Sequence, residues 1–376
     1  MVDSMRNNIK AIIIIGIVLI ATVITLSIVL PYFKKPNSPT MSTQVNLYIN
    51  SSLYSNITPE ITQYQQDIIN QGFTVNIYNW SNNNATNLRN HLINTTKQTS
   101  SLFGAVLIGN LPYVSFKNGS EIFPCDLYLM DLDGQWIDLD PSDGYYDNHL
   151  AGIGDIYPEI FIGRINPEPL NNLNHIAAYQ NYFHRNHAYR NGTLIRSNSQ
   201  LLYIDNDWSN IATAMYNDMT AYTNITMVSS NPITNDTDYK NRLTQSYEFV
   251  HVMVHSFYYQ HQFGTSGDGS EGIVTFTDIL NLNTQALFYN LFACSAARYK
   301  EINNLGTQYL FSNNTLALVG STKTGGMWMN SYFYTPLRQG KVFGEAFRLW
   351  WWNPLHGPWD TDSQGMVILG DPLLTI

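Results

Sequence analysis

Apolar and polar positions along the chain alternate in blocks that predict strands and helices in turn. Short apolar runs at 45–50, 73–79 and 102–110 have the length of strands. Between the first two, TPEITQYQQDIINQ at 58–71 has helical spacing and opens with a threonine followed by proline. The run at 102–110 is almost continuously apolar, as in a strand buried on both faces. The pattern predicts an α/β fold with a largely parallel sheet.

The same alternation resumes in the second half of the chain, after a helix expected at 167–186. A boundary near residue 195 divides the sequence into two α/β subdomains of comparable size, 44–195 and 196–376. Strands are expected there at 200–205, 222–228, 248–254, 285–293, 315–321 and 366–376, with helices at 209–220 and 238–245.

The first 43 residues have a different composition. A tail at 1–10 precedes AIIIIGIVLIATVITLSIVL at 11–30, whose length matches the apolar thickness of a bilayer. We expect 11–30 to be an uncleaved membrane anchor, with a signal peptide as the alternative, and 31–43 to be a linker. Repeated Asn-x-Ser/Thr sequences favour a location outside the cytoplasm for the remainder.

Composition and charge exclude several classes of protein. Of the 376 residues, 44% are hydrophobic and only 12% are charged, which excludes extensive disorder. The formal net charge is −9, and no run of Lys or Arg offers the basic surface that nucleic acid requires. The two cysteines, Cys125 and Cys294, lack the spacing of a structural zinc site.

Two expected strands end in residues that can do chemistry together. EFVHVMV at 248–254 is followed by His255, and QALFYNLFA at 285–293 is followed by Cys294. Sites in parallel sheets form beyond the carboxyl ends of strands, so neighbouring strands would bring this thiol and imidazole to one edge. An imidazole is the usual base for a nucleophilic thiol. An inert buried cysteine and a Cys125–Cys294 disulfide remain as alternatives.

Several segments resemble the gingipain-type peptidases, a branch of the caspase-like cysteine peptidases. Along the chain they are CDLYLMDLDGQW, DIYPEIFIGRINPE, HVMVHS, LFYNLFACS and the closing VILGDPLLTI, in the order that family has. The resemblance spans roughly residues 45–376. It implies a caspase-like, mostly parallel sheet flanked by helices, and hydrolysis of peptide bonds without a redox cofactor.

The resemblance also implies roles for individual residues. Cys294 would be the nucleophile, His255 the general acid/base, and the backbone N–H groups of Ser256 and Cys294 the oxyanion donors. Glu159 matches an acid that orients the histidine. Ser256 stands where the family usually has glycine, and its side chain could narrow the cleft.

Pocket and metal candidates complete the expected site. The loop after the 315–321 strand carries Thr324 and Trp328, which we expect to wall the substrate pocket together with His261. The aspartates of DLDGQWIDLDPSD have side chains suited to a structural Ca²⁺, and a solvated turn is the alternative. The metal candidates are Asp131, Asp133 and Asp138.

The sequence thus predicts a membrane-anchored cysteine endopeptidase that faces outward and takes protein or peptide substrates. Two alternatives stay open. One is a catalytically inactive homologue that binds or assembles at a surface. The other is a transpeptidase that passes the same acyl-enzyme to an amine.

Overall fold

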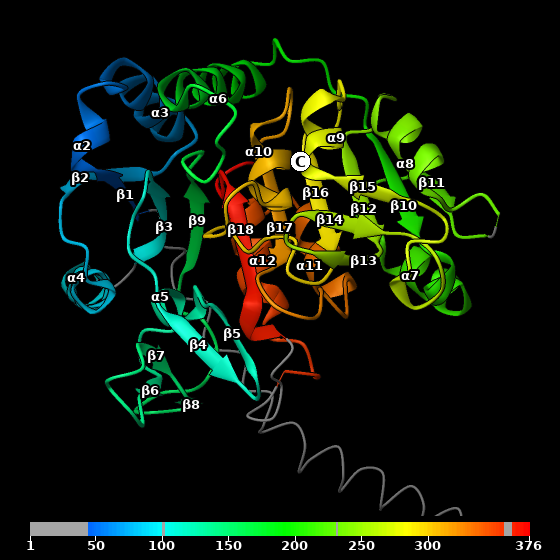
Figure 1. Ribbon diagram of the computed structural model, residues 1–376. Coiled ribbons are helices and arrows are strands. Elements are labelled where there is room, and N and C mark those ends of the chain that lie inside the picture. Colours follow the sequence, from blue (N-terminus) through cyan, green and yellow to red (C-terminus); the bar gives the residue numbers. More distant parts are fainter. Residues whose placement is uncertain (1–43, 100–101, 231, 357–362) are drawn as a thin grey trace, which may run out of the picture. The chain divides into compact units, whose positions relative to one another are not determined.

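A ten-stranded sheet is the framework of the chain from residue 44 onward (Figure 1). The computed structural model describes residues 44–99, 102–230, 232–356 and 363–376. Across the sheet the strand order is β11-β10-β12-β16-β17-β18-β9-β3-β1-β2. The strands are β1 (Gln44–Asn50), β2 (Thr74–Trp80), β3 (Leu102–Ile108), β9 (Phe161–Ile165), β10 (Ser199–Ile204), β11 (Asn224–Val228), β12 (Phe249–Met253), β16 (Phe288–Phe292), β17 (Ala317–Ser321) and β18 (Met366–Gly370).

The strands form two parallel sets that run in opposite directions. β17 and β18 pair antiparallel at the centre, and every other neighbouring pair in the sheet is parallel. The strands from β11 to β17 therefore end at one edge, and those from β18 to β2 end at the opposite edge. Because sites form beyond carboxyl ends, the sheet has two edges where a site can be built.

Helices cover both faces of this sheet, so its strands are buried on both sides. Tyr289 and Leu291 of β16 point into one apolar cluster, whereas Phe288 and Phe292 point into the other. One cluster includes side chains of α3 (Thr58–Asn70), α6 (His175–Arg190), α8 (Asp236–Leu243), α9 (Phe276–Asn281) and α10 (Leu305–Phe311). The other includes α4 (Ala85–Thr99), α5 (Leu127–Met130), α7 (Ala212–Asp218), α11 (Ser331–Arg338) and α12 (Phe343–Trp350).

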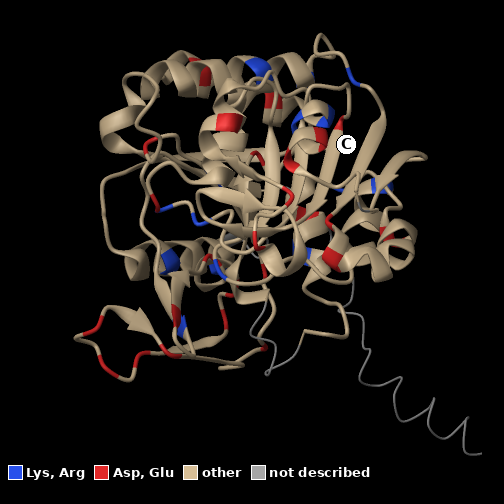
Figure 2. Ribbon diagram, turned by 45° about the vertical axis from the view of Figure 1, so that its right-hand side comes forward, with Lys and Arg blue, Asp and Glu red and all other residues tan. Residues whose placement is uncertain are grey.

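The segment that joins β3 to β9, residues 109–158, forms an acidic lobe. Every formally charged residue from 118 to 158 is Asp or Glu, and the red stretches of the ribbon in Figure 2 mark these residues along the loops of the lobe. Two small sheets and α5 give it order. Their strands are β4 (Ser115–Asn118), β5 (Glu121–Pro124), β6 (Gln135–Ile137), β7 (Tyr145–Tyr146) and β8 (Asn148–Leu150).

A smaller three-stranded sheet extends the loop that leaves β12. Antiparallel pairs join its strands in the order β13-β14-β15. These strands are β13 (His255–Phe257), β14 (Gln260–Gln262) and β15 (Ile273–Thr275). Short 3-10 helices and a single-turn helix complete the fold: η1 (Asn206–Ile211), η2 (Thr265–Gly267), η3 (Ser363–Gly365) and α2 (Ser51–Tyr54).

The predicted α/β class and mostly parallel sheet are confirmed. The helix predicted at 167–186 begins later, at His175, where the Asn174 side chain caps it by accepting from the backbone N–H of Ala177. Within the described residues, no helix has the length and apolar character needed to cross a bilayer. The predicted tail, anchor and linker, 1–43, lie outside the described residues. The subdomain boundary near 195 stays a prediction, and the main sheet takes strands from both sides of it.

Candidate active site

His255 and Cys294 follow the ends of two neighbouring strands. β12 and β16 are adjacent and parallel, and their register pairs Met253 with Phe292. Each candidate lies two residues beyond its member of that pair. Met253 and Phe292 face the same apolar cluster, and side chains two positions apart on a strand share a face. The strand register therefore brings the thiol and the imidazole to one edge on one side of the sheet, and both residues are half-buried.

A carboxylate fixes the His255 ring. The Nε2 atom lies 3.0 Å from Oδ2 of Asp207, which belongs to η1 directly after β10. The backbone N–H of Ser266 donates to the same oxygen at 2.5 Å. The Trp208 ring packs against the imidazole, with centroids 4.5 Å apart. The Asp207 carboxylate thus holds Nε2 of the ring, and the Trp208 indole packs against the imidazole.

Asp205 supports the segment that carries Asp207. It is fully buried at the end of β10, and its carboxylate accepts from the backbone N–H groups of Asn206 (2.9 Å) and Gly264 (3.3 Å). Burial and the nearby carboxylates raise the pKa of Asp205 to about 6, against the lowering effect of those hydrogen bonds. Through these two hydrogen bonds, Asp205 links η1 to the glycine-rich loop that follows β14.

That loop, residues 264–272, lies directly against the histidine. Gly267 has φ +68°, and a Cβ added there would lie 2.5 Å from the Cβ of His255. The neighbouring Ser266 also has a positive φ, 55°. A residue with a side chain at position 267 would have to displace the imidazole, so glycine is required for this close approach.

The segment after β17 packs against Cys294. The Gly325 backbone N–H lies 3.4 Å from the Cys294 sulfur. Ser295 has a positive φ of 58°, and its N–H donates to the carbonyl of Lys323 at 2.8 Å. A non-glycine residue in this conformation marks a backbone that the surrounding structure constrains, which is common next to reactive groups.

The two expected oxyanion donors differ in their surroundings. No acceptor for the Cys294 backbone N–H is found in the described part of the chain. The single hydrogen of the Ser256 hydroxyl is shared between the carbonyls of Phe257 (2.7 Å) and Gln260 (3.1 Å). Ser256 is not among the residues with positive φ. Serine therefore fits this position without strain, and its hydroxyl is engaged inside the β13–β14 hairpin.

Glu159 does not contact His255 through any described hydrogen bond. Its carboxylate accepts from the backbone N–H of Leu132 at 2.5 Å. Burial, together with Asp131 and Asp133, raises the pKa of Glu159 to about 8. The acid that lies on the imidazole is Asp207, and the orienting role expected for Glu159 stays a prediction. Glu159 is assigned by resemblance and precedes β9, whereas Asp207 follows β10, the neighbour of β12.

The carboxylates around Glu159 form a compact group. One ligand atom from each of Asp131, Asp133 and Glu159 lies within 4.8 Å of the others. Asp131 is fully buried and also contacts the Nε2 atom of His149. Asp138, the third residue expected at a metal site, does not belong to this group. The donor set is all oxygen, which suits a hard cation such as Ca²⁺.

Comparison with known proteins identifies the chain. The model of peptidase family C25 matches residues 48–376. The chain belongs to peptidase family C25, the gingipain family. No match was found among curated proteins. A crystal structure of a periplasmic binding ribose operon repressor protein from Lactobacillus acidophilus is 14% identical over 57% of this chain and 68% of that one. Its TM-score is 0.17, too low to bear on fold or function.

In this C25 chain the three residues expected to line the substrate pocket lie in different surroundings. Trp328 packs edge-on against Phe292, with centroids 4.6 Å apart, and so lies beside the strand that leads to Cys294. Thr324 is exposed, and its N–H donates to Glu121 of the acidic lobe at 2.9 Å. His261 is fully buried and contacts the Tyr309 hydroxyl at 3.1 Å, so it cannot line an open pocket. On β14 it faces the core, opposite to the direction expected.

The disulfide alternative is excluded because both cysteines are free. Cys125 is fully buried, and its thiol donates to the carbonyl of Gln364 at 3.2 Å. Burial also raises the pKa of the Cys125 thiol far above its ordinary value. Cys125 is thus a core residue, and Cys294 is the half-exposed thiol.

Sequence reasoning missed Asp207 and Gly267, the residues that hold His255 in place. A signal for Asp207 was present, because QLLYIDNDW ends an expected strand with acids. Recognising it required the information that this strand neighbours the histidine strand. Gly267 lies in GTSGDGSEG, where spacing alone does not distinguish one glycine from another.

Proposed function

We propose that the chain is a cysteine endopeptidase in which Cys294, His255 and Asp207 act together. Membership of family C25 supports the class of reaction. The observation that carries the assignment to these residues is the register of β12 and β16, with Asp207 hydrogen bonded to the imidazole. Three groups from three consecutive strands of the sheet thereby converge on one edge.

Each group has a distinct task in the proposed mechanism. The hydrogen bond to Asp207 keeps a proton on Nε2 of His255, leaving Nδ1 to take the proton of the Cys294 thiol. The thiolate attacks the carbonyl carbon of the scissile bond, and the Cys294 N–H stabilises the negative oxygen. The imidazolium then protonates the leaving amine as the C–N bond breaks. Water, deprotonated by His255, attacks the thioester and releases the carboxylic acid.

Loss of cleavage on removal of the thiol tests this proposal. Full-length protein is incubated with a mixed peptide library, and products are identified by mass spectrometry. Cys294→Ala is expected to abolish cleavage, and Cys125→Ala, the matched control, to retain it in whatever fraction folds. Equal cleavage by wild type and Cys294→Ala would contradict the proposal. Folded wild-type protein that cleaves nothing would also contradict it, and this is the result expected of an inactive homologue.

The same incubation separates hydrolysis from transpeptidation. An added amine nucleophile competes with water for the thioester, because either can attack the acyl carbon. We expect free carboxylic acids as the main products of an endopeptidase. Products joined to the added amine, with few acids, would indicate the transferase alternative.

We further propose a structural Ca²⁺ held by Asp131, Asp133 and Glu159. The close approach of three carboxylates, one of them fully buried, supports this site. A cation would offset their mutual repulsion and add stability without taking part in the reaction. Added Ca²⁺ should raise the melting temperature of wild type and not of Asp133→Asn; an equal rise in both would place the ion elsewhere.

The proposed location is outside the cytoplasm, with residues 11–30 as a membrane anchor. The uninterrupted apolar run supports this location. Full-length protein should stay with membranes after alkaline extraction, whereas a variant lacking 11–30 should be released. Release of the full-length protein would contradict the anchor.

A further inference from the structure

The edge of the sheet opposite to the candidate active site carries a cavity of its own. β1, β3 and β9 run opposite to β12 and β16, so their carboxyl ends lie at the other edge. From β1 the chain passes to β2 on one side and later to β3 on the other. Ligands of open α/β sheets bind at such a reversal, outside the strand ends.

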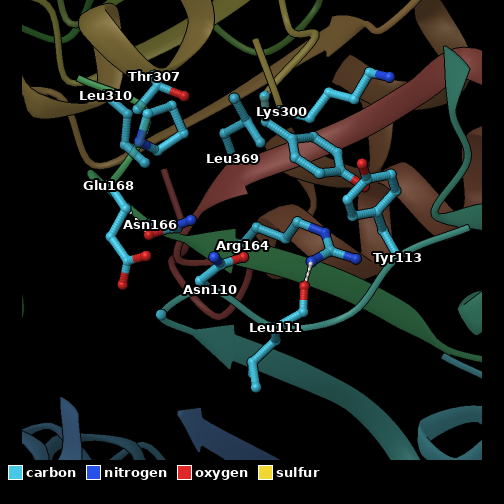
Figure 3. Close-up of a pocket in the computed structure, with 13 residues that line it drawn as sticks. Asn110, Leu111, Tyr113, Arg164, Asn166, Glu168, Lys300, Thr307, Leu310 and Leu369 are labelled. Carbon is cyan, nitrogen blue, oxygen red and sulfur yellow. Dashed lines mark hydrogen bonds between the residues drawn. The ribbon is translucent and has the colours of Figure 1, made fainter. Parts of the chain in front are cut away.

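The cavity has a volume of about 350 Å³ and lies at the carboxyl ends of β3, β9 and β18 (Figure 3). Gly109 at the end of β3 approaches β1 so closely that an added Cβ would lie 2.7 Å from that of Asn50. Two further hollows adjoin this one, and Glu168 lines all three. Glu168 is half-buried, two residues beyond Asn166 in the segment that leaves β9.

Among the charged groups that line the cavity, Glu168 has no hydrogen-bonding or ion-pair partner for its carboxylate in the described residues. Arg164 forms two hydrogen bonds with Asp126, at 2.7 and 2.8 Å, so its charge is already balanced. The Lys300 ammonium lies 3.9 Å from Glu301 and, in Figure 3, points away from Glu168. No hydrogen bond or ion pair of the Glu168 carboxylate is found among the described residues. Glu168 is therefore the carboxylate of the lining that a ligand can reach.

The remaining polar groups are neutral and point both donors and acceptors at a ligand. The Asn166 carbonyl oxygen accepts from the Tyr179 hydroxyl (2.9 Å) and the Glu168 N–H (3.1 Å), which leaves its NH₂ group unused. The side chains of Asn110 and Thr307 also line the cavity. Amides and hydroxyls both donate and accept hydrogen bonds, as a sugar hydroxyl does.

Aromatic surface completes the lining. Tyr113 and Tyr299 meet edge to face in the wall of the cavity, with centroids 5.9 Å apart. The Arg164 guanidinium packs on the Tyr299 ring, 4.7 Å from its centroid, so the more exposed Tyr113 is the ring that offers an apolar surface to the C–H face of a pyranose. Leu111, Leu310 and Leu369 add apolar surface, so the lining combines polar groups with apolar side chains.

We propose that this cavity binds a carbohydrate, with Glu168 accepting hydrogen bonds from two adjacent hydroxyls and the Asn110 and Asn166 amides completing the contacts. The proposal is independent of the peptidase reaction, because the two sites occupy opposite edges of the sheet. A carbohydrate at this edge would give the chain a second recognition site, separate from Cys294 and His255.

Saturation-transfer NMR on the full-length protein, with a panel of free hexoses, pentoses and amino sugars, tests this directly. At least one sugar should show transfer, with stronger saturation of its C–H face than of the rest of the ring.

Glu168→Gln removes the charged acceptor and should weaken binding about tenfold. Asn110→Trp, at an exposed position beside the mouth, should abolish it by filling the cavity. Asp140→Asn, in the acidic lobe, is the control and should bind as wild type does.

Three outcomes would overturn the proposal. The first is no transfer to any sugar in the panel. The second is transfer that persists unchanged in both Glu168→Gln and Asn110→Trp. The third is selective binding of simple alkylammonium ions, run as a parallel panel, which would show that Glu168 selects a cation. Peptidase activity, measured on the same samples, should be unchanged in the variants, so failure of one proposal does not decide the other.

Discussion

At the scale of single residues, the site depends on what surrounds one imidazole. Asp207 binds the far nitrogen of His255, Trp208 packs on its ring, and Gly267 lies against its Cβ. His255 and Cys294 could be found from the sequence because each follows an apolar strand. Asp207 could not, because carboxylates are frequent at strand ends and only the strand order selects among them.

Replacing Asp207 by Asn should lower kcat about a hundredfold with little change in KM. The amide can no longer stabilise the imidazolium, and it can hold the ring in the wrong tautomer. Glu159→Gln is the matched control, because Glu159 is the alternative acid and its raised pKa keeps much of it protonated at neutral pH. Steady-state kinetics on both variants decides the assignment; a greater loss of kcat in Glu159→Gln would reverse it.

At the scale of elements, the strands were predictable and the loops were not. Apolar runs at 102–110, 248–254 and 285–293 became β3, β12 and β16 because strands buried on both faces are apolar throughout. The acidic lobe has little periodicity, and its small sheets are held by aromatic contacts such as Phe116–Trp136, which spacing does not reveal. The direction of β18 was equally hidden, since a buried strand has the same pattern whichever way it runs.

The loop at 264–272 supports a prediction at this scale. Gly267→Ala should lower kcat at least tenfold, because its Cβ would displace His255, and misplacement by about 1 Å can cost a hundredfold in rate. Gly269→Ala is the control. It also has a positive φ, +73°, but its added Cβ would meet only Ile273, at 3.3 Å. Kinetics and melting temperatures should show similar destabilisation of both and loss of kcat in Gly267→Ala alone. Equal loss of kcat would mean that loop strain, and not contact with His255, is responsible.

At the scale of the whole molecule, the sheet carries chemistry at one edge and a separate cavity at the other. This arrangement follows from the single antiparallel pair, β17 with β18. The core between the helices also contains two histidines that take no part in the proposed reaction. His251 contacts the Tyr334 hydroxyl at 2.8 Å, and His261 contacts that of Tyr309 at 3.1 Å.

These buried histidines predict acid sensitivity of the folded chain. Burial lowers the pKa of both His251 and His261 to about 3. In the unfolded chain they titrate near about 6.5, so the unfolded state binds more protons below that pH and stability falls as the solution is acidified. Each should cost about 2 kcal/mol of unfolding free energy between about pH 7 and about pH 5.

Urea unfolding at the two pH values measures this effect. His251→Gln and His261→Gln should each reduce the loss of stability on acidification, whatever their stability at neutral pH. The comparison uses the difference between two pH values within one protein, so a general destabilisation cancels. An unchanged pH dependence in both variants would contradict the account.

The most direct test of the central claim is covalent labelling of the thiol by a peptidyl epoxide, with the modified residue identified by mass spectrometry. The account predicts a single adduct on Cys294 in wild-type protein, none on Cys125, and much slower labelling in His255→Ala. Folded wild-type protein that forms no adduct, or labelling of Cys294 at the same rate in His255→Ala, would contradict it.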